Sequence, residues 1–287
     1  MNGWTFARAL AIKGLPCRAI AAAAIGLASG GAQGEPLRPE VTRAEQLATD
    51  RVHAALEARD CSKAVQYLNE GLSARHPGLY LIAGTMFEEG LCLKPDWNRA
   101  QRHYQAGLEA GHRGGLFKMV AGLAQGPRDV AAALWWAQRG LTGAMPAPCL
   151  AEPAIHEVPE KYVEWLQSWP ASRLSACVYT AGVLATLTGD LLYPQQARSL
   201  QLTGRVAMRF VPAEGRIDWT TLESDMPPPV GVVSEGWMRD RRSPRVQDFL
   251  RRHLDAAGQQ ALKRFEPRPP GIDPGWTSQQ EYVFTLQ

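Results

Sequence analysis

The sequence predicts a multidomain protein in which an all-α helical repeat solenoid is followed by a small α+β domain of strand-strand-helix-strand order. Two observations predict this class: the first half of the chain matches itself at a shift of thirty-six residues, and hydrophobic spacing changes from a helical to a strand period after about residue 190. The expected segments are 1–34 as signal peptide, 48–142 as helical repeats, 143–189 as linker and helical spacer, and 190–287 as C-terminal domain.

The first residues have the pattern of an export signal. Arg8, Lys13 and Arg18 precede a short apolar run over residues 19–27, after which small residues begin. We expect cleavage near residues 32–34, a periplasmic location and no stable membrane span afterwards, because a spanning helix needs roughly twenty apolar residues. The alternative is an uncleaved segment that anchors the protein in the inner membrane, facing the periplasm.

Removal of the signal leaves an electrically balanced chain. The formal net charge of +3 falls to zero, because three basic residues and no acidic residue lie within 1–34. A balanced chain lacks the basic face that phosphate backbones require, so nucleic acid is not an expected partner.

Four cysteines remain in the mature region: Cys61, Cys92, Cys149 and Cys177. An even number in an oxidising compartment predicts two disulfides. Of three possible connectivities we favour the sequential one, since each pair then falls within one structural unit and closes a loop of about thirty residues, worth roughly 3 kcal/mol. Free buried thiols are the alternative.

An internal repeat organises the first half. Residues 60–90 match residues 96–126, and a weaker third copy follows, with Asp129 and Ala133 at a shift of thirty-three from the second. Each copy is interpreted as a pair of antiparallel helices, capped by its first aspartate and closed by glycine, which must stack on its neighbours and so presents a concave surface. The matched positions are Asp60 with Asp96, Ala64 with Ala100, Gly71 with Gly107, His76 with His112, Gly78 with Gly114, and Gly90 with Gly126.

The second copy carries a recognisable pattern, formed by Ala100, Tyr104, Ala106, Gly107 and Gly111. Over about residues 48–142 the chain resembles Sel-one-like repeats, relatives of the tetratricopeptide class. This resemblance implies a helical solenoid used for protein contact. In cysteine-rich exported members of that family a disulfide ties the two helices of a repeat, which matches Cys61 with Cys92. The third copy departs from the pattern at Gln138 and Arg139, and we expect it to act as a cap.

The second half begins with a Pro- and Ala-rich linker, after which the hydrophobic spacing changes from that of helices to that of strands. Residues 203–211 alternate in the period of a strand, the turn at Glu214 and Gly215 leads into a second alternating run, and residues 246–264 have an amphipathic helical spacing. We expect helices over 162–169, 172–188 and 246–264, and strands over 203–211, 216–223 and 282–286.

The order of these elements, with Gly204-Arg205-Val206 opening the first strand and Phe265 and Pro267 ending the helix, resembles the C-terminal domain of TonB-type energy transducers over roughly residues 190–287. That family adds a partner's extended strand to the edge of its sheet. The resemblance implies an envelope or outer-membrane partner, or a homodimer through the sheet. The implied partner-binding residues are Tyr193, Pro194, Tyr282 and Phe284. The chain departs from the family in lacking the long Pro-rich spacer and, if cleaved, the membrane helix.

No common catalytic, metal-binding or cofactor-binding motif is present, so we expect no catalytic residue, metal or cofactor. His76 and His112 occupy equivalent turns and are interpreted as structural rather than as ligands, and Asp96 and Asp129 as helix caps rather than paired carboxylates. Trp135 and its neighbour Trp136 are interpreted as core residues rather than a ligand platform.

The functional hypothesis from the sequence is a non-enzymatic periplasmic scaffold or adaptor that holds other proteins. The alternatives are a TonB-type component of outer-membrane transport and an envelope enzyme that acts on cell-wall material.

Overall fold

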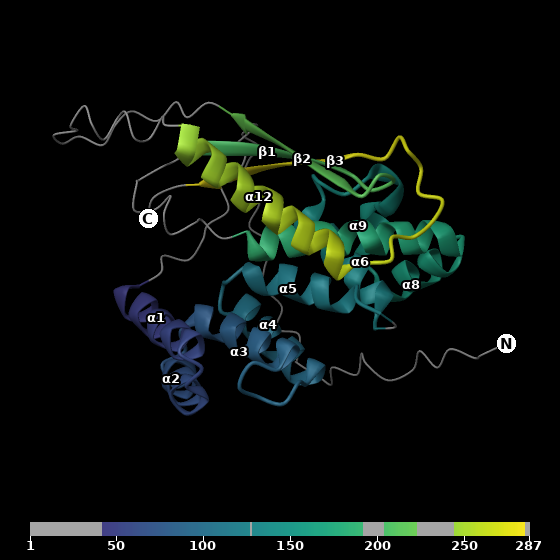
Figure 1. Cartoon of the computed structure of the whole chain (residues 1–287). Coiled ribbons are helices and arrows are strands. Elements are labelled where there is room, and N and C mark those ends of the chain that lie inside the picture. The colour runs from purple at the N-terminus through teal and green to yellow at the C-terminus, as the bar shows by residue number, and fades with distance from the viewer. Residues whose placement is uncertain (1–41, 127, 192–203, 223–243, 285–287) are drawn as a thin grey trace, which may run out of the picture. The chain divides into compact units, whose positions relative to one another are not determined.

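The computed structural model describes residues 42–126, 128–191, 204–222 and 244–284, all within the compact unit Arg38–Gln287. The described chain is mostly helical and carries a three-stranded antiparallel sheet near its C-terminus (Figure 1), which confirms the coarse part of the predicted fold class. The expected signal segment and the candidates Tyr193 and Pro194 lie outside the described residues.

Helices account for most of the first two thirds of the described chain. The bounds are α1 Arg43–Glu57, α2 Cys61–Ser73, α3 Pro77–Glu89, α4 Trp97–Glu109, α5 Gly114–Leu123, α6 Val130–Leu141, the 3-10 turn Ala147–Cys149, α7 Pro153–His156, α8 Pro159–Gln167 and α9 Ala171–Asp190. The helices expected over 162–169 and 172–188 are thus present as α8 and α9, with ends shifted by one to three residues.

The three repeat-start aspartates cap helices, as the repeat register predicts. Asp60, Asp96 and Asp129 precede α2, α4 and α6, and their Oδ1 atoms accept a backbone N–H from three residues later at 3.1, 3.0 and 2.9 Å. These bonds satisfy donors that the first turn of a helix otherwise leaves free. Gly90 then ends α3 with a φ of 74°, a left-handed conformation that glycine adopts without strain.

Small residues let the repeat helices pack closely. The equivalent alanines Ala64, Ala100 and Ala133 are fully buried. At Gly115 a Cβ would lie 2.2 Å from the backbone carbonyl oxygen of Tyr104, so α4 and α5 meet there almost backbone to backbone. A glycine is therefore required at this crossing.

Helix α1 precedes the first copy of the repeat and contributes to the start of α3. Its Glu45 is buried, and Oε1 accepts the backbone N–H of Gly78 at 2.6 Å, at the start of α3. His76, the N-cap residue of α3, makes no capping bond with its own side chain. The Glu45 carboxylate from α1 therefore caps α3, and its negative charge lies at the positive end of the α3 dipole.

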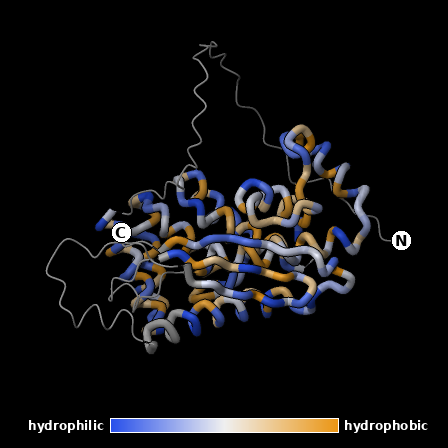
Figure 2. Tube along the Cα trace, turned by 90° about the horizontal axis from the view of Figure 1, so that it is seen from above, coloured by the Kyte–Doolittle hydropathy of each residue, from blue (hydrophilic) through white to orange (hydrophobic). Residues whose placement is uncertain are grey.

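The C-terminal elements are β1 Gly204–Val211, β2 Arg216–Leu222, α12 Pro244–Arg264 and β3 Ser278–Phe284. The strand order is β2-β1-β3, and both pairs are antiparallel. Phe210 of β1 pairs with Ile217 on one side and with Ser278 on the other. Hydrophobic and hydrophilic residues mix along the three strands (Figure 2), as expected for a sheet with one covered face.

Helix α9 joins the repeats to the sheet in one apolar core. Its glycine Gly182 lies against the ring of Phe265, where an added Cβ would come within 2.4 Å, and its Tyr179 ring lies 6.0 Å from the Phe210 ring. Buried residues from the expected repeat, spacer and C-terminal segments belong to the same cluster, from Ala100 to Ile272. The spacer is therefore part of the core rather than a separate linker.

The final strand begins earlier than expected. It runs over Ser278–Phe284 instead of starting at Tyr282. Residues Ser278 to Glu281 are all polar, so they do not show the alternation of apolar and polar residues that predicts a strand. Ser278 is nevertheless buried, with 1% of its surface exposed. The expected strand end at Leu286 lies outside the described residues.

Candidate functional site

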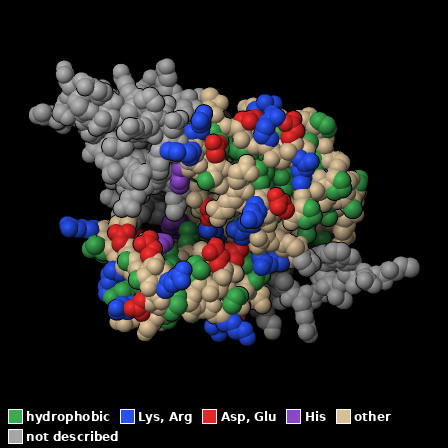
Figure 3. Space-filling view, viewed as in Figure 1, with side chains coloured by type: hydrophobic (Ala, Val, Ile, Leu, Met, Phe, Trp, Pro, Cys, Tyr) green, Lys and Arg blue, Asp and Glu red, His purple; other side chains and the backbone are tan. Residues whose placement is uncertain are grey.

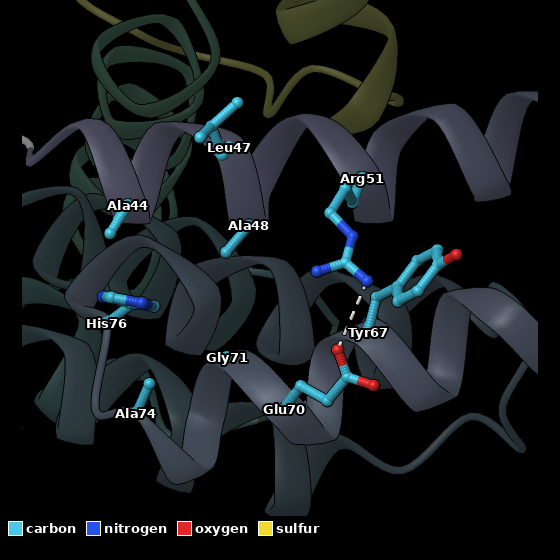
Figure 4. A pocket seen from close by; sticks show the side chains of 9 residues that line it. All are labelled: Ala44, Leu47, Ala48, Arg51, Tyr67, Glu70, Gly71, Ala74 and His76. Carbon is cyan, nitrogen blue, oxygen red and sulfur yellow. Dashed lines mark ion pairs between the residues drawn. The ribbon is translucent and has the colours of Figure 1, made fainter.

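The groove between α1 and α2 is the first candidate site (Figure 4). It has a volume of about 210 Å³, and small side chains form much of its wall. We call it the α1/α2 groove. Its lining residues are Ala44, Leu47, Ala48, Arg51, Tyr67, Glu70, Gly71, Ala74 and His76.

A cation and an aromatic ring stand at one side of the groove. The Arg51 guanidinium lies 4.2 Å from the centre of the Tyr67 ring, and its Nη2 is 3.5 Å from a carboxylate oxygen of Glu70. Both charged side chains are about half exposed, at 55% and 47%, so the ion pair is worth roughly 0–1 kcal/mol. These groups remain available to a partner, and the exposed Leu47 adds an apolar contact.

The groove is open because its side chains are smaller than those thirty-six residues later, between α3 and α4. Counting thirty-six residues forward, Arg51 and Tyr67 correspond to Phe87 and His103, whose rings stack with centroids 5.5 Å apart. Ala44 corresponds to Tyr80, whose side chain lies beside Gly107 between α3 and α4. Equivalent positions are thus in contact in the α1/α2 and α3/α4 pairs, but the side chains between α1 and α2 are smaller and more polar.

The four cysteines form two disulfides in the sequential pairing. Cys61 bonds to Cys92 and Cys149 to Cys177, with Cα atoms 5.0 and 5.5 Å apart. The second bond is buried, and it fastens the irregular segment after α6 to α9. Free thiols are therefore excluded at all four positions.

The partner-binding candidates on β3 lie in different environments. The hydroxyl of Tyr282 packs inward near Thr188 of α9, and its burial raises the tyrosine pKa to about 12. The side chain of Phe284 lies outside the described set, although its backbone pairs with Gly204. On the other face of β3, Val283 is 56% exposed.

Within the described ranges, no group of three histidine, cysteine or acidic side chains is arranged to hold a metal ion. His103 is packed against Phe87, and burial lowers its pKa. Trp135 stacks on His156 at 5.6 Å and lies under the guanidinium of Arg139 at 3.9 Å. Trp135 and Trp136 both pack against the large buried cluster, in agreement with the core role that the sequence favoured for them.

Charged side chains of both signs are interspersed on the face drawn in Figure 3. A second cavity lies where α3, α9 and α12 meet, lined by charged residues that the sequence analysis did not select. No repeat or motif connects α3 to α12, so their proximity could not be read from the pattern.

Comparison with protein-family models, with curated proteins and with solved structures found no match. Among the residues described, no helix is long and apolar enough to cross a membrane.

Proposed function

We propose that the protein is a non-enzymatic scaffold of the cell envelope, exported to the periplasm, which holds another protein in the α1/α2 groove. In this proposal α1 to α6 act as a short helical solenoid and the C-terminal sheet is a second contact surface. The observation that carries it is the α1/α2 groove itself, which repeats the framework of α3/α4 without its bulky filling.

The chemistry of the groove fits a polypeptide segment. Ala44 and Ala48 leave room for a side chain, while the Arg51 guanidinium and the Glu70 carboxylate can bind polar groups of the same segment. Two disulfides fit an oxidising compartment. The sheet, with β2 and β3 at its two ends, supports the second surface.

The test places a photo-crosslinking residue at Leu47, which is 55% exposed in the groove, and a matched one at Leu91, which is 39% exposed and does not line the groove. In cells that express the full chain with its own N-terminal segment, we expect a specific cross-linked envelope protein from position 47 only. Ala48→Trp, which fills the groove, should abolish that product. The same products from both positions would contradict the proposal.

A TonB-type role in outer-membrane transport is the second candidate. The order β1, β2, α12, β3 supports it, because the resemblance implies this sequence of elements. This role requires residues 1–31 to stay attached as an anchor. Mass spectrometry of the mature N-terminus separates the two, since a chain that starts near residue 34 is compatible with the scaffold and not with the anchored transducer.

A further inference from the structure

The two disulfides of the described chain differ in how far solvent reaches them. Cys149 and Cys177 are 2% and 0% exposed, so a dissolved thiol cannot approach their sulfur atoms. Cys61, by contrast, is exposed in the first turn of α2, and Cys92 is partly buried in the segment between α3 and α4. Thiol–disulfide exchange requires that a thiolate reach one sulfur atom, so access separates labile disulfides from structural ones.

The backbone at Cys92 adds a second difference. Its φ is 59°, in the left-handed region, which is unfavourable for a residue that carries a Cβ atom. Neither cysteine of the buried pair has a positive φ. The bond to Cys61, with Cα atoms 5.0 Å apart, constrains the position of Cys92. Breaking that bond allows the backbone to relax, which favours the open form.

The exposed bond fastens a part of the protein that has a small core of its own. It joins the start of α2 to the segment after α3, and Cys92 packs against a cluster that runs from Val52 to Met86, separate from the main one. A small core depends more on a cross-link than a large core does. Opening the bond therefore loosens α1, α2 and α3, while the cluster around α9 stays packed.

We propose that the Cys61–Cys92 disulfide is a reversible redox site, opened by a protein that carries an exposed Cys-x-x-Cys dithiol, whereas the Cys149–Cys177 bond is structural. A thiolate of the dithiol attacks Sγ of Cys61, the bond to Cys92 breaks, and Cys92 leaves as a thiolate that takes up a proton. The second thiolate of the dithiol then attacks its partner sulfur in the mixed disulfide and releases Cys61. The chain gains two electrons and two protons, and the dithiol becomes a disulfide.

The consequence of this opening for binding rests on the proposed scaffold function. Helices α1 and α2 form the walls of the α1/α2 groove, so loosening them removes the groove and releases its occupant. The redox site itself does not depend on that function, because the exchange needs only the exposed bond. The experiments below therefore measure the cysteines and the helices without any groove partner.

The first test measures which cysteines become free when the folded, full-length protein is treated with dithiothreitol. Free thiols are blocked beforehand with iodoacetamide, samples are quenched over time with N-ethylmaleimide, and mass spectrometry of peptides locates the second label. Cys61 and Cys92 should be labelled at least about tenfold faster than Cys149 and Cys177. In urea the difference should disappear, because burial no longer protects the second pair. Equal rates in the folded protein, or a difference that persists in urea, would overturn the proposal.

The second test identifies the sulfur atom that is attacked. A thioredoxin-type protein that keeps only its attacking cysteine should be trapped as a mixed disulfide with Cys61, the more exposed partner. The complete dithiol protein should open the Cys61–Cys92 bond, and oxidised glutathione should then restore the same pairing. A trapped adduct on any other cysteine, or a reduced form that does not regain this pair, would contradict a reversible site.

Hydrogen exchange separates local opening from unfolding of the whole chain. When the reaction is stopped after the Cys61–Cys92 bond has opened, exchange should be at least about tenfold faster in α2 and α3 and unchanged in α9. Unchanged exchange in α2 and α3 would mean that the bond controls no structure. Faster exchange in α9 as well would mean global unfolding, and either result would overturn the proposal.

Discussion

The repeat units 60–92 and 96–128 share one framework and are fastened by different chemistry. In the first unit a disulfide joins Cys61 to Cys92. Thirty-six residues later the equivalent positions hold Trp97 and Arg128, and the guanidinium lies 4.4 Å from the centre of the tryptophan ring. The same point of the unit is therefore closed covalently in one copy and by a cation–π contact in the other.

The difference follows the size of the core behind each unit. The first unit has its own small cluster of buried residues, from Val52 to Met86, whereas the second belongs to the large cluster that includes α9 and the sheet. A small core supplies little stability, and a cross-link compensates by restricting the unfolded chain. The repeat thus determines which two positions join the start and the end of a unit. The size of the buried core behind the unit determines how strong that join must be.

The largest effect should come from removing the covalent closure. Cys61→Ser with Cys92→Ser opens a sequence separation of 31 residues, which should lower the free energy of unfolding by about 3 kcal/mol. Urea denaturation of the oxidised protein measures this, and hydrogen exchange should show lost protection in α2 and α3 but not in α9. An unchanged midpoint would mean that the small core is sufficient by itself.

The second unit should be sensitive at the crossing of its helices instead. Gly115→Ala puts a Cβ 2.2 Å from the Tyr104 carbonyl oxygen, so α4 and α5 must separate at a cost of about 2 kcal/mol or more. The first unit has Leu79 at the equivalent position, packed against Gly71. Gly143→Ala, where a Cβ meets nothing within 4 Å, is the control in thermal unfolding. Equal midpoints for the two variants would refute the close crossing.

The cation–π closure should contribute less than the disulfide. Arg128→Ala removes the contact with Trp97 and a hydrogen bond of 2.7 Å to the Gly122 carbonyl, for a loss of about 1–2 kcal/mol. Urea denaturation measures this loss. Arg102→Ala, an exposed change on α4, serves for comparison and should be nearly neutral. A loss as large as that of the cysteine variant would show that the two closures are equivalent.

The parts that the sequence predicts well are local or periodic. The aspartate caps, the pairing of Cys61 with Cys92 and of Cys149 with Cys177, and the alternation of β1 each depend on spacing within one segment, which the printed chain displays. Helix α1 was less visible, because Ala44 and Arg51 stand where α3 has the aromatic residues Tyr80 and Phe87.

The cavity between α3, α9 and α12 could not be predicted because it depends on which distant segments meet. Glu88 and Arg264 are 176 residues apart, and neither belongs to a repeat or motif that pairs them. The α1/α2 groove likewise exists because its wall lacks aromatic side chains at the positions equivalent to Tyr80 and Phe87. Spacing alone predicts neither a void nor an ion pair between elements.

The smallest effect concerns the cap of the first unit. The pKa of Asp60 is lowered, first by the hydrogen bond from the Lys63 side chain and then by that from the Lys63 backbone N–H. Because the folded-state pKa lies below the unfolded one, the stabilisation is fully present above the unfolded pKa and is lost as pH falls through the folded pKa. Lys63→Gln removes the charged donor and keeps the backbone bond.

Carboxyl NMR titration of Lys63→Gln should therefore show the Asp60 pKa moving part of the way back to its usual value. Lys94→Gln, an exposed change in the loop before α4, should leave it in place. A pKa that does not respond to Lys63→Gln would assign the whole shift to the helix N-terminus. In that case all three caps would depend on the same backbone hydrogen bond. Asp96 and Asp129 also accept it, although the donor residue is Arg99 in one cap and Ala132 in the other.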